Sequence, residues 1–252
     1  YEIRHIVRDA LERWYGPDTG RERNIMYYLT VYNEPIRQPA EPEDVDVEGI
    51  IRGIHKLDDA PEGAGPQVQL LASGVGVPWA REARRILAEE WGVRAGVWSV
   101  TSWGELRREA LEAERHNFLN PSAAPRTPYV TAALAGAEGP FVATSDYDHA
   151  VPDLIRAWVP GDYRVLGADG FGFSDTRAAA RRHYLIDAHS IVVKALQALA
   201  DQGRVDRPVL QLAVEHHRDA RSAAQRPADP APSAPDPAEP AESEESAESA
   251  LE

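Results

Sequence analysis

The sequence predicts an α/β protein in which helices cover both faces of a mostly parallel sheet, giving three layers. Two observations predict this class. From Val68 onward, short apolar runs of strand composition alternate with helical segments, a pattern typical of parallel sheets. Residues that begin helices, namely Pro78, Ser102 and Asp187, stand between the two kinds of segment.

The chain opens in an amphipathic helix whose apolar residues share one face: Ile3, Ile6, Val7, Ala10, Leu11 and Trp14. Gly16-Pro17 ends this helix, and Ile25–Val31 has the composition of a strand. Because Tyr1 rather than Met stands first and the helical pattern is already running there, we interpret the chain as a fragment. A processed start is the alternative.

The composition of residues 35–66 indicates a connection between domains. This stretch is rich in proline and charge and has little periodicity until Gly49–Ile54, where the pattern predicts a short strand or turn. The expected strands of the sheet are Val68–Ala72, Val93–Val100, Phe141–Thr144 and Tyr163–Leu166. Helices are expected over Trp79–Trp91, Trp103–His116, about 150–158, and Pro208–Arg218.

Two more helices follow the last strand. Ser174 and Asp175 are both suitable N-caps for a helix over Thr176–His183, and Asp187 is one for a helix over Ala188–Asp201. The apolar residues of the second helix keep helical spacing: Ile191, Val192, Ala195, Leu196 and Leu199.

The charge of the chain argues against several kinds of partner. Lys and Arg number 27 against 41 Asp and Glu, a net charge of −14, whereas nucleic acids and anionic membranes attract basic surfaces. No apolar run approaches the roughly 20 residues that a membrane helix needs. We therefore expect no nucleic-acid and no membrane partner. The absence of Cys excludes disulfides and thiolate chemistry, and it fits a cytoplasmic protein.

Residues 222–252 predict a disordered tail rich in Ala, Pro and Glu. Residues 227–252 hold eight acidic side chains and no basic ones, so removing their charge from −14 leaves −6 for the rest. Such a segment has too little to bury to offset its ordering entropy. An acidic docking segment is the functional alternative to a solvated tail.

No motif identifies a catalytic or metal site. Ser73–Gly76 joins a strand to a helix as a phosphate-binding turn would, but Trp79 stands where a dinucleotide fingerprint needs its third glycine. Adjacent helical residues point about 100° apart, so His216-His217 is a poor chelate and is expected at the surface. The six Trp residues are expected to fill the core and interfaces.

One basic cluster is a candidate anion contact. Arg181, Arg182 and His183 would concentrate positive charge. The alternative is that they form the basic last turn of a helix and complement its dipole.

Several family-specific motifs stand in one order along the chain: Leu11–Gly16, Tyr27–Glu34, Gly49–Leu57, Val97–Trp103, Glu114–Asn117, Ser145–Tyr147, Gly167–Arg177 and Arg181–Asp187. Together they resemble homodimeric-type pyruvate dehydrogenase, the thiamine-diphosphate decarboxylase of the pyruvate dehydrogenase complex, which is related to transketolase. The likeness covers Tyr1 to about Asp219. Several matches in one order are harder to obtain by chance than any single motif.

The resemblance implies a polypeptide of three α/β domains, of which this chain holds the end. Residues 1–34 would close the second, pyrimidine-binding domain, and 35–66 would connect it to the third, overlapping that domain's start. Residues 48–219 would be a transketolase-like C-terminal domain. The full enzyme would use thiamine diphosphate and Mg²⁺ to decarboxylate pyruvate and transfer the acetyl unit to lipoyl groups.

The family's Gly-Asp-Gly…Asn motif does not occur here, since Asp169-Gly170 has no paired Asn after it. The resemblance therefore implies that this segment binds no cofactor alone, has no catalytic residue and is inactive by itself. Its role would be structural and dimer-forming. The implied partners are the rest of its polypeptide, the second subunit of a homodimer and the lipoyl acetyltransferase component.

Thr30, Asn33 and Glu34 are candidate substrate-channel residues. They stand where a strand ends, and ligands approach the carboxyl ends of strands in doubly wound sheets. The resemblance implies that this edge lies near the substrate channel. The alternative is that Asn33 makes the turn before Pro35.

Two other functions stay open. One is a free-standing binding or regulatory module of the same fold, without catalysis. The other is a fragment of a transketolase-like transferase. Phosphosugar enzymes would be expected to keep a basic phosphate contact at the Thr30–Asn33 turn, which carries no charge here.

Overall fold

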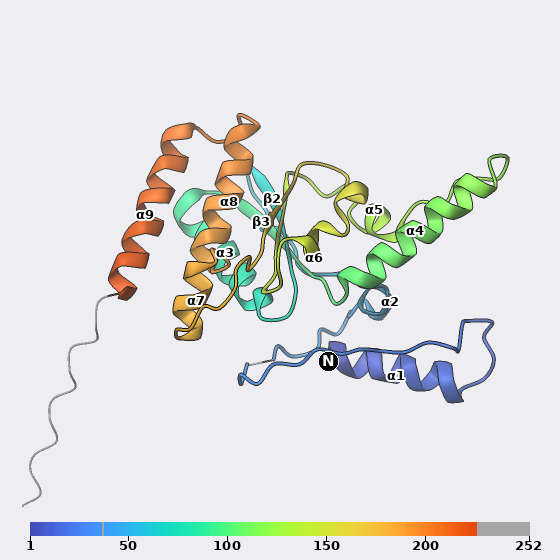
Figure 1. Ribbon diagram of the computed structural model, residues 1–252. Helices are drawn as coiled ribbons and strands as arrows, with labels where there is room; N and C mark the ends of the chain where they lie inside the picture. The colour runs from blue at the N-terminus through green and yellow to red at the C-terminus, as the bar shows by residue number, and fades with distance from the viewer. Residues whose placement is uncertain (37, 226–252) are drawn as a thin grey trace, which may run out of the picture.

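The computed structural model describes residues 1–36 and 38–225, with side chains described up to residue 218. Within these residues, five strands form one sheet in the order β1-β3-β2-β4-β5 (Figure 1). Neighbours among β2 (Gln67–Ala72), β3 (Arg94–Ser99), β4 (Phe141–Thr144) and β5 (Tyr163–Leu166) pair in parallel, and β1 (His55–Asp58) pairs antiparallel with β3. The predicted α/β class with a mostly parallel sheet is confirmed.

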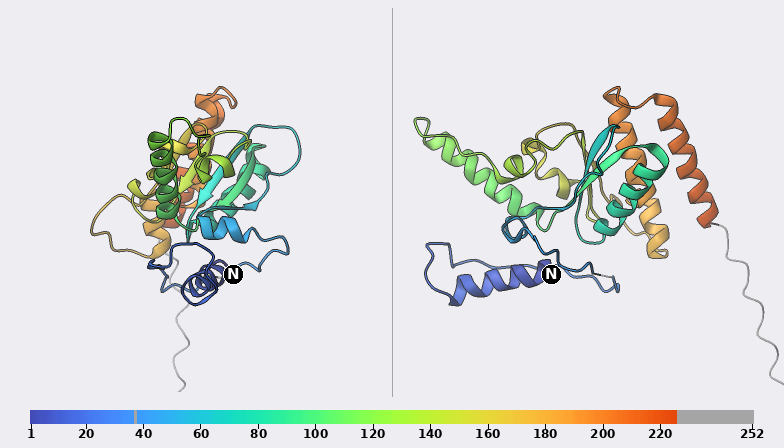
Figure 2. Two further views of the ribbon diagram at one scale, coloured as in Figure 1. Left: turned by 90° about the vertical axis from the view of Figure 1, so that its right-hand side faces the viewer. Right: turned by 180° about the vertical axis from the view of Figure 1, so that it is seen from behind.

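Helices cover both faces of this sheet, which gives the three expected layers (Figures 1 and 2). On one face lie α3 (Gly76–Trp91) and α8 (Ala188–Asp201), with α9 (Arg207–Gln225) packed outside them. The other face is covered by α4 (Trp103–Leu119), α5 (Tyr129–Ala133), α6 (Ala150–Asp153) and a 3-10 turn, Arg156–Trp158.

The central strand β2 supplies both hydrophobic cores. Leu70 packs into the core under α3 and α8, Leu71 into the core under α4 and α5, and both are fully buried. Successive side chains of a strand point to opposite faces. A strand of a sheet covered on both faces is therefore apolar on both sides, which explains the continuous apolar run at this position.

Two of the three predicted helix caps are confirmed. The Glu105 N–H donates to Ser102 Oγ at 3.0 Å at the start of α4, and the Ser190 N–H donates to Asp187 Oδ1 at 3.0 Å at the start of α8. The prediction for α7 (Arg177–His183) was wrong, because its cap is Thr176 rather than Ser174 or Asp175. The helix begins one residue later than expected, so the Thr176 hydroxyl oxygen accepts a hydrogen bond from the Ala179 N–H at 3.3 Å.

The predicted strand Ile25–Val31 was wrong for this chain. The helix before it, α1 (Glu2–Tyr15), forms as expected, but the segment itself is extended and pairs with no strand of the described residues. Met26 and Tyr28 are 89% and 88% exposed. The segment has strand composition, but no strand of the described residues lies beside it to form a ladder.

The expected strand or turn at Gly49–Ile54 is instead a helix, α2 (Val47–Arg52). The Gly49 N–H donates to Asp46 Oδ1 at 2.8 Å, which caps the helix, and Gly53 ends it with a φ of +107°. Strand β1 follows at once and was not predicted. Capping chemistry at both ends of a six-residue segment outweighs its strand-like composition.

Three further expectations need correction. The helix expected over 150–158 is broken into α6 and the 3-10 turn. Helix α9 runs to Gln225, beyond the expected Arg218, and so includes the first residues of the stretch 222–252. Residues 226–252 lie outside the described part of the chain. His217 is buried rather than at the surface.

None of the helices in the described residues has the length and apolar content needed to cross a membrane.

Candidate functional site at the carboxyl edge of the sheet

The N-terminal segment crosses the loops that leave the carboxyl ends of the parallel strands (Figure 1). The Tyr32 hydroxyl donates to Asp146 Oδ1 at 2.9 Å, in the loop that follows β4. Its oxygen also lies against Gly74 in the loop after β2, where a Cβ would stand 2.2 Å from it. Burial, followed by the Asp146 charge, raises the pKa of Tyr32. The phenol is therefore a neutral donor that joins residue 32 to two loops.

The next two residues are held by α7. Arg177 Nη2 donates to Asn33 Oδ1 at 3.0 Å, and Arg181 Nη2 donates to Glu34 Oε2 at 2.5 Å. Arg177 Nε lies 3.6 Å from the same Glu34 oxygen. The hydrogen bond from Arg181 is the main reason that the pKa of Glu34 lies below its ordinary value. We call Asn33, Glu34, Arg177 and Arg181 the anchor cluster.

The anchor cluster joins two sets of residues that the sequence analysis treated separately. Asn33 and Glu34 were candidate substrate-channel residues, and Arg181 belonged to the candidate anion contact. The structure brings Glu34 and Arg181 together as an ion pair. Thr30, the third channel candidate, is exposed and makes no hydrogen bond within the described residues.

The other two members of the basic cluster point elsewhere. The His183 ring stacks on Phe173 with centroids 4.1 Å apart and planes within 8°, and Tyr184 meets both rings edge-on. Arg182 is half-buried and has no ion-pair partner among the described residues. All three basic residues stand in the last turn of α7, as the helix-dipole alternative expected.

A second contact fastens the neighbouring loops. Asp169 Oδ1 accepts from the His149 N–H at 2.8 Å, and Asp169 Oδ2 lies 2.6 Å from His149 Nδ1. Both carboxylate oxygens of Asp169 are thus engaged by one residue. Among the described residues, no group of three His, Asp or Glu side chains is arranged to hold a metal ion.

Sequence reasoning missed Arg177, Tyr32 and Asp146. A signal existed for Arg177, because residues four apart lie on one face of a helix and would have been grouped with Arg181. Tyr32 and Asp146 are separated by 113 intervening positions. Nothing local in the sequence pairs them.

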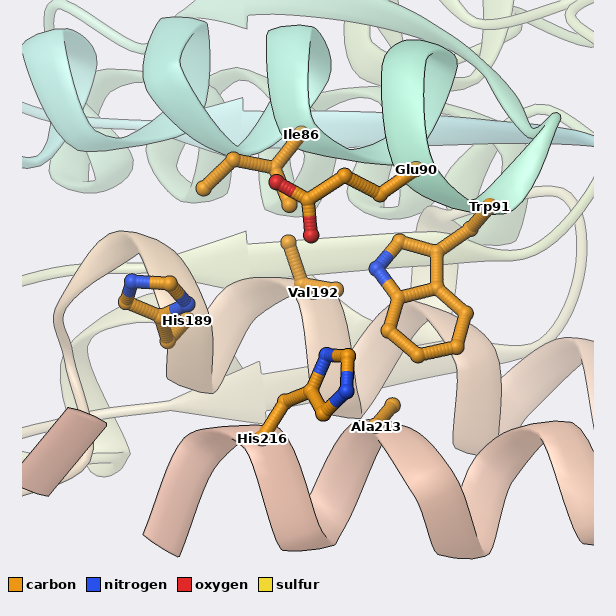
Figure 3. Close-up of a pocket in the computed structure, with 7 residues that line it drawn as sticks. All are labelled: Ile86, Glu90, Trp91, His189, Val192, Ala213 and His216. Atoms are coloured by element: carbon orange, nitrogen blue, oxygen red, sulfur yellow. The ribbon is translucent and has the colours of Figure 1, made fainter. Parts of the chain in front are cut away.

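A separate cavity of about 260 Å³ lies between α3, α8 and α9 and shares no residue with the carboxyl edge (Figure 3). Its polar lining is Glu90, His189 and His216, and the Trp91 indole closes one side, with its ring centroid 5.6 Å from that of His216. Glu90, an exposed residue of α3, points into this cavity (Figure 3).

The layering and the strand order define a three-layer α/β domain with a mostly parallel sheet. The family model described as the transketolase-like TK C-terminal domain matches residues 53–187. The chain belongs to this family.

The curated relatives share one name, which is narrower than the domain family, and they confirm the resemblance to pyruvate dehydrogenase. The chain is 52% identical to the pyruvate dehydrogenase E1 component of Mycolicibacterium smegmatis over 218 residues, 86% of this chain and 23% of that protein. It is 49% identical to the Mycobacterium tuberculosis protein of the same name, over 91% of this chain and 24% of that protein. The chain is 44% identical to the Escherichia coli protein of the same name, over 85% of this chain and 23% of that protein. The chain thus spans about a quarter of the length of these relatives.

Among solved structures, one that the chain matches is transketolase from Leishmania mexicana. The identity is 19%, the TM-score 0.42, and the match covers 63% of this chain and 20% of that one. A split-gene transketolase, described as an inactive beta4 tetramer, matches at 18% identity and a TM-score of 0.38, over 58% of this chain and 42% of that one.

Proposed function

We propose that this chain is the C-terminal part of a pyruvate dehydrogenase E1 component, which decarboxylates pyruvate and transfers the acetyl unit to lipoyl groups. The observation that carries the proposal is the extent of the match. Identity reaches 52% over 86% of this chain, but over only 23% of the relative. The remaining domains of such an enzyme would lie in polypeptide outside these 252 residues.

Within that enzyme, the role of this chain is structural. Residues 1–34 close the pyrimidine-binding domain, residues 35–66 connect it to the next, and residues 48–219 form the C-terminal domain. Support comes from Ile25–Val31, whose backbone is extended and pairs with no strand of the described residues, and whose Met26 and Tyr28 are exposed. An unpaired strand with exposed apolar side chains is a template for a neighbouring strand, which the preceding polypeptide would supply.

Thiamine diphosphate and Mg²⁺ would be held by the preceding domains, where the cofactor supplies the carbanion chemistry of decarboxylation. One observation supports this assignment. Asp169, the aspartate of the Asp169-Gly170 pair that could suggest a diphosphate motif, has its carboxylate engaged by His149. We assign no catalytic step to this chain and propose that Thr30, Asn33 and Glu34 border the substrate channel.

The chain would also contribute to a homodimer and to a cytoplasmic complex with the lipoyl acetyltransferase component. Support for a subunit contact comes from the end of α4, which projects from the domain (Figure 1). Phe118 and Leu119 at this end are 84% and 60% exposed. Exposed apolar side chains gathered at one place are typical of interaction surfaces.

Pyruvate decarboxylation by the complete polypeptide tests the proposal. With thiamine diphosphate, Mg²⁺ and a lipoyl acceptor, the complete polypeptide should release CO₂ from pyruvate, and the 252-residue chain alone should match a blank. A phosphosugar ketol donor is the control substrate. Turnover of the phosphosugar without turnover of pyruvate would instead identify a transketolase-like transferase.

A further inference from the structure

Three successive residues are each tied across the carboxyl edge to the C-terminal domain, the first to a loop and the next two to α7. Tyr32 binds the loop after β4, Asn33 binds Arg177, and Glu34 binds Arg181. A residue that only makes a local turn would bond its own backbone about two residues on. The Asn33 side chain instead accepts a hydrogen bond from a residue 144 positions away. The turn is fixed by tertiary contacts.

Arg181 is the best-held member of the anchor cluster. Its side chain is 15% exposed, compared with 55% for Arg177. Its guanidinium carbon lies 5.5 Å from the centre of the Trp79 ring on α3. The indole supports the planar group from one side while Glu34 accepts its hydrogen bond, an arrangement that suits Arg better than Lys.

Arg181 affects the candidate channel residues through the covalent backbone, because it holds Glu34 in place. Glu34 comes three residues after Val31, the last residue of the extended segment. A fixed Glu34 therefore limits where Thr30 and Asn33 can lie. A shift of about 1 Å in a positioning group can lower kcat/KM strongly, even when that group touches no reacting atom.

We propose that Arg181 is a positioning residue for pyruvate turnover, which acts by holding Glu34 and so fixing the Thr30–Asn33 border of the channel. The inference rests on the proposed function, because the reaction it serves belongs to the complete enzyme. It assigns Arg181 no contact with substrate or cofactor. It also replaces the role of anion contact for this residue, since its charge is already met by Glu34.

The test compares kcat and KM for pyruvate in the complete polypeptide. R181Q and E34Q each remove the same ion pair from opposite sides, and the R181Q/E34Q double variant measures whether their effects are coupled. R181K is the conservative variant. R85Q is the matched control, because Arg85 pairs with Glu82 and Glu89 on the exposed side of α3 and so loses its ion pairs away from the carboxyl edge.

We expect R181Q and E34Q each to raise KM for pyruvate by about tenfold, with kcat within about twofold of the wild type. The double variant should be no worse than either single change, and R181K should recover part of the loss. R85Q should match the wild type. The thermal midpoint of each variant shows that folded enzyme is being compared.

Three results overturn the inference. If R181Q and E34Q have the KM of R85Q, Arg181 positions nothing that substrate meets. If activity falls only in kcat, in proportion to the loss of folded enzyme and without recovery in R181K, the ion pair is merely structural. If the wild-type polypeptide itself does not turn over pyruvate, the proposed function fails and the inference fails with it.

Discussion

Asp9 is the buried carboxylate around which the N-terminal segment folds. It accepts hydrogen bonds from Arg21 at 2.7 Å and from the Tyr27 hydroxyl at 2.7 Å, and only 4% of it is exposed. Burial raises the pKa of Asp9. The hydrogen bonds from Arg21 and Tyr27, together with the arginine charges, lower it by more than burial raises it, so the pKa lies below its ordinary value. These contacts hold the extended segment against α1.

This pKa predicts how the segment responds to acid. A carboxylate whose pKa is depressed in the folded state stabilises that state above its unfolded pKa, near 4, and the stabilisation is lost as the pH falls through the folded pKa. D9N should remove about 1.5–3 kcal/mol of local stability at pH 7 and flatten the pH dependence. The indole N–H resonance of Trp14, which donates to the Ile25 carbonyl at 3.2 Å, reports the contact.

An NMR titration from pH 7 to pH 2 checks this prediction. The Trp14 signal should move toward its free position below pH 4 in the wild type and stand near that position throughout in D9N. A signal in D9N that matches the wild type at pH 7 would mean that Asp9 does not hold the segment.

The absence of a side chain at Gly74 leaves the space that the Tyr32 ring occupies at the carboxyl edge. The φ of Gly74 is +52°, and a Cβ there would lie 2.2 Å from the Tyr32 hydroxyl oxygen. G74A should displace Tyr32, break its bond to Asp146 and lower the free energy of unfolding by about 2 kcal/mol. Gly172 is the matched control, because its φ is +72° but no atom lies within 4 Å of its Cβ position.

Urea unfolding of both variants measures the two contributions. G172A bears only the backbone strain, so it should cost about 1 kcal/mol. The excess in G74A should disappear when Tyr32 is changed to Ala in the same chain. Equal losses in G74A and G172A would show that Tyr32 is not packed against the loop.

At the scale of elements, the sequence predicted the segments whose stability is local. Strands β2 to β5 were found because their apolar runs are bounded by turn residues, and α4 and α8 because Ser102 and Asp187 are strong caps. The segment Val47–Arg52 was missed, because in six residues the caps decide between helix and strand. A strand was predicted over Ile25–Val31 from its composition, but a strand forms only beside a partner strand.

The exposed segment Ile25–Val31 should behave differently in the chain and in the complete polypeptide. Without a neighbouring strand, its amides should exchange with solvent within seconds in the isolated chain. In the complete polypeptide, where a preceding sheet would receive it, the same amides should be protected at least a hundredfold. Hydrogen exchange read by mass spectrometry on peptides covering 25–31 makes the comparison. Strong protection in the isolated monomer would contradict the assignment of this segment to a preceding domain.

At the scale of the whole molecule, the sequence predicted the layered architecture and the family. At the carboxyl edge it predicted some of the residues that meet there but none of the contacts between them. Glu34 and Arg181 were both singled out, yet in different roles, because 147 positions separate them and no local pattern joins them. Tyr32 was quoted in a motif and given no function. Long-range polar pairs of this kind depend on how the N-terminal segment lies across the domain, which periodicity and capping do not encode.

The mass of the native polypeptide tests the central claim most directly. An antibody raised against this chain would be used on an extract of the source cells, with denaturing electrophoresis to separate the species it recognises. The account predicts one species about four times the 27.7 kDa of the chain, since the chain spans about a quarter of its relatives. A native species of 27.7 kDa would contradict it and would indicate a free-standing module without the catalytic domains.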